Sequence, residues 1–141
     1  MEIDTHKVTF LLDEILPVFE HHLRKTPTDP SSLIDQINRG DCGLFSLCLG
    51  SGLEAMGETV TYIEVNGQFR GHAFVKWGDK YFDSVNPEGL DSLEKSKFWK
   101  EDMRVSEQDY ETQKRSWVHE TDDLGLAILN DWKEVLRTLN E

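Results

Sequence analysis

Residues 59–85, TVTYIEVNGQFRGHAFVKWGDKYFDSV, form the most strand-like stretch of this 141-residue chain. β-branched and aromatic residues are frequent in it, and polar and apolar residues alternate instead of recurring at helical spacing. Two pairs of turn-forming residues, Asn66-Gly67 and Gly78-Asp79, divide the stretch into three runs. This pattern predicts a three-stranded antiparallel meander.

The second turn decides which side chains of the last two strands share a face. Glycine followed by aspartate suits a two-residue type II′ turn, in which the first central position favours glycine. Trp77 then pairs with Lys80. Counting back along both strands makes His72 and Asp83 diagonal neighbours on one face, about 7 to 8 Å apart at the backbone, so their side chains are expected to meet. One more residue in the turn would direct Asp83 to the opposite face.

Asn86 is a second candidate for a polar partner of the histidine. In the two-residue register it lies on the face opposite to that of His72, unless the strand bends at the following Pro87. Asn86 is therefore kept as the alternative to Asp83.

Upstream of the strands, residues 37–50 read INRGDCGLFSLCLG and begin a strongly apolar run. Asp41 is a suitable N-cap residue, apolar residues follow it at helical spacing, and Gly57 is a suitable C-terminal stop. Because the run is apolar on most sides, we expect a central, buried helix.

Cys42 falls at the first turn of this expected helix. Unpaired backbone N–H groups and the helix dipole at such a position lower the pKa of a thiol and favour the reactive thiolate. Gly43 is expected to leave the backbone uncovered, so that a substrate carbonyl can use the Cys42 N–H as an oxyanion donor. The alternative is a small buried cysteine ahead of a core helix, which is the commoner use of the residue.

The rest of the chain is predicted to be helical on both sides of this core. Apolar residues recur at three- and four-residue steps over 8–23, in a helix that Pro17 is expected to kink or divide. The tryptophans of the C-terminal part, Trp99, Trp117 and Trp132, are assigned to core or partner packing. Further helical segments are predicted at 33–39, 92–100, 106–119 and 122–139.

The length of the chain is suited to one domain with one main core. We divide residues 1–141 into an N-terminal helical segment at 1–35, a core at 36–89 and a C-terminal helical segment at 90–141.

The charge balance is strongly acidic, with 27 acidic against 15 basic residues and a formal net charge of −12. A field of this sign repels nucleic acid phosphates and anionic membranes, and it favours neutral or basic partners. The sequence contains no pattern of an export signal and no apolar run long enough to span a membrane. A cytoplasmic location is expected.

The two cysteines, Cys42 and Cys48, lie about 9 Å apart along the axis of one expected helix, which is too far for a disulfide. Both are expected to be free thiols. Two thiols and five scattered histidines do not show the paired spacing of a zinc site, so neither a metal nor an organic cofactor is expected.

The segments QINRGDCGLFSL, at 36–47, and GHAFVKWGDKYFDSVNPEG, at 71–89, resemble the papain-like cysteine peptidase superfamily, especially its bacteriocin-processing C39-like and transglutaminase-like branches. In those families an upstream glutamine helps to form the oxyanion hole, a cysteine opens the central helix, and a histidine and then an aspartate or asparagine follow on adjacent strands. By this resemblance, Gln36 helps to form the oxyanion hole and Cys42 is the cysteine that opens the central helix. His72 is the histidine, and Asp83 is the acid that follows it.

The resemblance implies an α+β papain-like fold, with a central helix packed on a small antiparallel sheet and additional N- and C-terminal helices. It also implies acyl transfer through a thioester, with hydrolysis of a peptide or other amide bond as the main expectation. Cys42 attacks, His72 serves as base and then acid, and Asp83 orients the imidazole, with Asn86 as the alternative third member.

Two other functions remain open at this point. A thioester enzyme that passes its acyl group to an amine, or that acts on side-chain amides, would be a transglutaminase or a deamidase. A degenerate member of the superfamily would be a non-catalytic, acidic module that binds a partner protein. The expected substrate is a peptide or protein, with a basic peptide as one candidate, and the oligomeric state stays open.

Overall fold

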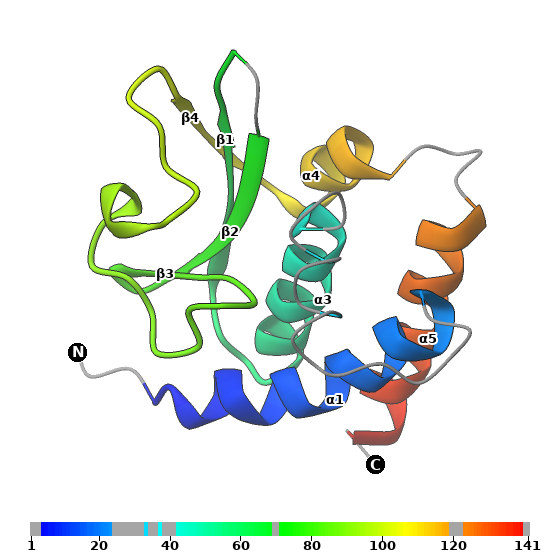
Figure 1. Ribbon diagram of the computed structural model, residues 1–141. Coiled ribbons are helices and arrows are strands. Elements are labelled where there is room, and N and C mark those ends of the chain that lie inside the picture. The colour runs from blue at the N-terminus through cyan, green and yellow to red at the C-terminus, as the bar shows by residue number, and fades with distance from the viewer. Residues whose placement is uncertain are drawn as a thin grey trace.

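The computed structural model describes residues 4–23, 33, 37, 42–68, 71–118 and 123–139. Within these residues the chain forms an α+β fold, in which helices cover one face of a small antiparallel sheet and a long irregular segment lies on the other (Figure 1). The expected fold class is confirmed at this level.

The sheet contains the predicted meander and one additional strand. Its order is β3-β2-β1-β4, and every neighbouring pair is antiparallel. The strands are β1 (Val60–Asn66), β2 (Gly71–Trp77), β3 (Lys80–Phe82) and β4 (Arg104–Gln108).

The structure corrects two of the predicted helices in the C-terminal segment. Residues 92–100 contain a single 3-10 turn, η2 (Leu93–Lys95), instead of a helix. Residues 106–108 belong to β4, because pairing with β1 satisfies backbone groups that the edge of β1 would otherwise leave exposed. Helix α4 (Tyr110–Trp117) begins only after Asp109, whose carboxylate caps it by accepting the Thr112 N–H at 2.8 Å.

The central helix is α3 (Cys42–Ala55), which packs against β1 and β2. Glycine permits a close approach here, because a Cβ built on Gly50 would lie 2.3 Å from the ring of Tyr62. The helix ends at Gly57 as expected. That glycine has φ +90, and the N–H of Glu58 bonds to the carbonyl of Leu53 at 3.0 Å, which is a Schellman cap.

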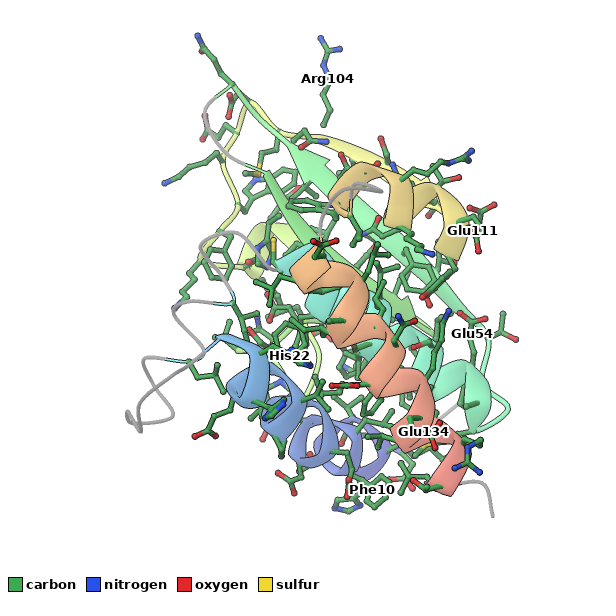
Figure 2. The ribbon with its side chains drawn as sticks, turned by 90° about the vertical axis from the view of Figure 1, so that its right-hand side faces the viewer. Phe10, His22, Glu54, Arg104, Glu111 and Glu134 are labelled. Atoms are coloured by element: carbon green, nitrogen blue, oxygen red, sulfur yellow. The ribbon has the colours of Figure 1, made fainter. Side chains whose placement is uncertain are left out.

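Two further helices pack on α3, on the side away from the sheet. α1 (His6–Leu23) continues through Pro17 without a division, and α5 (Asp123–Leu139) lies beside it (Figure 2). The Asp131 carboxylate, on α5, bonds the His22 imidazole of α1 at 2.5 Å. The indole N–H of Trp132 donates to Ser51 Oγ on α3 at 3.1 Å.

The sheet separates two hydrophobic clusters. The larger lies between the helices and the face of the sheet that carries Tyr62, Val75 and Trp77. The smaller lies on the opposite face, where the side chains of Val65 and Phe74 meet the segment after β3. Successive residues of a strand alternate between these faces.

The predicted helical turn at 33–39 lies almost entirely outside the described residues. Leu33 and Ile37 are described, and both side chains are buried in the larger cluster.

Candidate active site

The second hairpin has the predicted register. Trp77 pairs with Lys80 and Val75 with Phe82, across a two-residue turn. Gly78 has φ +64 and Asp79 does not have a positive φ, as a type II′ turn requires. Continued beyond the end of β3, this register makes Asp83 a diagonal neighbour of His72.

The His72 and Asp83 side chains do meet. His72 Nε2 and Asp83 Oδ2 are 2.9 Å apart, and the two side chains are only 1% and 2% exposed. Because a carboxylate can only accept, the neutral imidazole carries its proton on Nε2. Nδ1 is then the basic nitrogen of the ring.

The second oxygen of Asp83 is also held. Its Oδ1 accepts the backbone N–H of Val85 at 3.1 Å and the side-chain amide of Asn86 at 2.6 Å. The chain turns here, since the Asn86 N–H also donates to the Asp83 carbonyl at 3.2 Å. Asn86 therefore lies against Asp83 and orients the carboxylate.

Two phenylalanines hold the plane of the imidazole. Phe98 stacks on the His72 ring with a centroid distance of 4.1 Å and an angle of 25°, and Phe74 meets its edge at 4.7 Å. Phe98 comes from the irregular segment between β3 and β4 and is not among the site residues expected from the sequence. A phenylalanine in such a segment carries no local signal of this contact.

Cys42 lies at the first residue of α3, as expected, and is 5% exposed. The expectation for Gly43 is wrong, however. A Cβ built on Gly43 would lie 2.1 Å from Cγ of Trp117, so the last residue of α4 covers this part of the backbone. The glycine provides room for an indole.

The topology brings the starts of α3 and β2 to the same end of the molecule. A short link joins the end of α3 to β1, β1 runs back along the helix, and β2 therefore begins at the end of the sheet that lies on the side of the first turn of α3 (Figure 1). His72 is the second residue of β2.

The thiol and the imidazole nevertheless start from different faces of the sheet. His72 shares the face of Phe74, whereas α3 packs on the face of Tyr62 and Val75. One edge of β2 is paired with β1, and the other edge is paired with β3. Because β3 ends at Phe82, no strand of the described chain pairs with this second edge at the level of His72. Side chains from the two faces can approach each other at this edge of β2, beyond the end of β3 and beside the turn at 83–86.

Three other residues bear on the predicted site. Gln36 and Asp41 lie outside the described residues, so the structure gives no account of the oxyanion glutamine or of the helix cap. Cys48 is described and fully buried, and burial raises the pKa of its thiol far above the ordinary value. It is the inert cysteine of the pair.

Within the described ranges, no group of three or more His, Cys, Asp or Glu side chains is arranged to hold a metal ion. No helix among the described residues combines the length and the apolar character needed to cross a bilayer.

Comparison with models of known protein families, with curated proteins and with solved structures found no match for this chain.

Proposed function

We propose that the protein is a cysteine-dependent acyl-transfer enzyme that hydrolyses a peptide or other amide bond. The observation that supports this proposal is the buried hydrogen bond between His72 and Asp83, in which both carboxylate oxygens are held. A carboxylate fixed in this way orients an imidazole and stabilises the imidazolium that forms when the ring accepts a proton.

The cost of burying this pair supports a role beyond stability. Taking an imidazole and a carboxylate out of water is unfavourable, and apolar residues of similar volume often serve a core as well or better. His72 and Asp83 lie among the apolar side chains of the smaller cluster, where Phe74 and Phe98 contact the ring.

In the proposed reaction, His72 Nδ1 takes the thiol proton of Cys42, and the thiolate attacks the substrate carbonyl carbon. The Gln36 side chain stabilises the oxyanion, and the Cys42 N–H is not assigned this role, because the Trp117 indole covers the backbone at Gly43. As the C–N bond breaks, the imidazolium protonates the leaving amine, and a thioester remains. His72 then takes a proton from water, whose oxygen attacks the thioester, and the acid and the free thiol are released.

The donor and the acceptor of the acyl group together distinguish this hydrolysis from its close alternatives. An amine in place of water gives a transglutaminase, and a glutamine side chain as the substrate gives a deamidase, through the same thioester. Peptides with and without primary amines, analysed by mass, would separate the three reactions.

A specific observation favours a second candidate, a non-catalytic partner-binding module. His72 and Asp83 are almost fully buried, and Phe98 covers one face of the imidazole. A catalytic site needs access for its substrate. Here the substrate would have to approach at the edge of β2 beyond the end of β3.

The experiment that decides between the candidates is alkylation of the intact protein with limiting iodoacetamide at a series of pH values, read at each cysteine by peptide mass. We expect Cys42 to react near neutral pH about tenfold or more faster than an ordinary thiol of pKa about 8.5. His72→Ala should remove most of this difference. Cys48 is the internal reference, because its thiol is buried.

The matched control is His22→Ala, which removes a hydrogen-bonded histidine from α1, away from β2. This variant should leave the pH profile of Cys42 alkylation unchanged. A wild-type Cys42 that reacts like an ordinary thiol, with the same rate in His72→Ala, would exclude the enzyme and favour the binding module.

A further inference from the structure

Trp117, the last residue of α4, packs closely over Gly43, and its indole extends towards Gly71; the two glycines adjoin the proposed nucleophile and base. A Cβ built on Gly43 would lie 2.1 Å from Cγ of the indole. The position of a Cβ on Gly71 lies 3.7 Å from Cη2, at the far end of the same ring system. Gly43 follows Cys42, and Gly71 precedes His72.

We propose that Trp117 is a positioning residue, whose indole sets the start of α3 against the start of β2 and thereby places Cys42 relative to His72. This inference rests on the proposed function. Trp117 acts through the backbone at Gly43, over which it packs, and through the neighbouring start of β2, towards which its ring extends, and not on the reacting atoms themselves.

The two ends of the indole have different contacts. The atoms nearest the backbone, Cβ, Cγ and Cδ2, lie over Gly43, at a distance that no side chain there would permit. The six-membered ring extends to Gly71. Because packed interiors transmit small displacements, the size of the ring fixes the spacing of the two segments.

The indole N–H gives a second, independent indication. Trp117 Nε1 is buried and has no hydrogen-bond partner among the residues that the structure describes. A buried donor without a partner is unfavourable, and phenylalanine would avoid that cost. The reach of the larger ring towards Gly71 is the feature that distinguishes tryptophan from phenylalanine at this position.

The test is Trp117→Phe in the full-length protein. Phenylalanine keeps the atoms over Gly43 but is too short to reach Gly71. We expect the alkylation rate of Cys42 near neutral pH to fall about tenfold, because small displacements of reacting groups have large effects on rate. The midpoint of its pH profile should move towards that of an ordinary thiol, a change that loss of stability alone would not cause.

Trp132→Phe is the matched control. It likewise shortens a tryptophan to phenylalanine, here a buried one, and removes the bond to Ser51 on α3, but it lies on α5 away from Gly43 and Gly71. In Trp132→Phe, the pH profile of Cys42 alkylation should remain that of the wild type.

The outcomes separate the two proposals. A wild-type Cys42 that depends on His72, with an unchanged profile in Trp117→Phe, would overturn the positioning role and leave the enzyme intact. A wild-type Cys42 without any dependence on His72 would overturn the proposed function, and the positioning role with it. A shifted profile in Trp117→Phe alone, at a melting temperature no lower than that of Trp132→Phe, supports the positioning role.

Discussion

Asp83 is the residue on which the most contacts of the site converge. One carboxylate oxygen meets His72, and the other accepts from Val85 and Asn86. The hydrogen bonds inside this small turn decide the direction of the imidazole and hence which of its nitrogens is basic.

At this scale we predict the effect of removing Asn86. Asn86→Ala leaves Asp83 Oδ1 with one donor fewer in a buried setting, and it should lower the free energy of unfolding by about 1 to 2 kcal/mol. The change is measured by urea unfolding.

The control is Asn66→Ala, which removes an exposed asparagine whose amide bonds to Glu64. It should cost about 0.5 kcal/mol or less, because an exposed hydrogen bond is readily replaced by water. Equal losses in the two variants would show that the Asn86 contact has no special weight.

At the scale of single elements, the end of α3 shows how much a local pattern determines. Gly57 adopts a positive φ, and the Schellman cap there directs the chain back into β1. A glycine after an apolar helix was sufficient to predict this stop, because few other residues adopt that conformation without strain.

The cap provides a clean test of backbone strain. A Cβ built on Gly57 has no neighbour within 4 Å, so Gly57→Ala introduces strain without a clash. We expect a loss of about 1 to 2 kcal/mol in urea unfolding. Gly57→Asn should lose less, because asparagine tolerates the left-handed region, and an equal loss would argue against this explanation.

β4 shows the opposite case among the elements. RVSEQ is short and mostly exposed, and its pairing with β1 decides its conformation. Neither periodicity nor propensity within five residues could identify that partner, so a helix was predicted where a strand forms.

At the scale of the whole molecule, an ion pair ties α1 to the core. Lys7 Nζ lies 2.6 Å from Glu58 Oε1, and the indole N–H of Trp77 donates to Oε2 at 3.2 Å. The hydrogen bond from Lys7 is the main cause that lowers the pKa of Glu58 below its ordinary value of 4.5.

The sign of the resulting pH dependence follows from this shift. A carboxyl whose pKa is lower in the folded state stabilises the fold above its unfolded pKa, and this contribution is lost as the pH falls through the folded value. Glu58→Gln should therefore melt at a lower temperature than the wild type at pH 7, and the difference should shrink below about pH 4.

Added salt should also reduce the difference, because the pair is partly exposed. A difference in melting temperature that stays constant from pH 7 to pH 3 would contradict the assignment, since it would not depend on the charge of Glu58.

The sequence by itself determined the features that local chemistry controls. These are the central helix that begins at Cys42, its stop at Gly57, the type II′ turn, and through that turn the meeting of His72 and Asp83. Each depends on residues near one another in the chain or joined by one short turn, so counting along the backbone was enough.

Only the tertiary structure decided which distant segments cover the site. Three contacts join distant parts of the chain: Phe98 on the imidazole, Trp117 over Gly43, and the pairing of β4 with β1. The sequence of one part gives no indication that it will contact the other. Their placement follows from burying apolar surface and pairing backbone groups across the whole molecule, and these are properties of the packed chain that no local pattern contains.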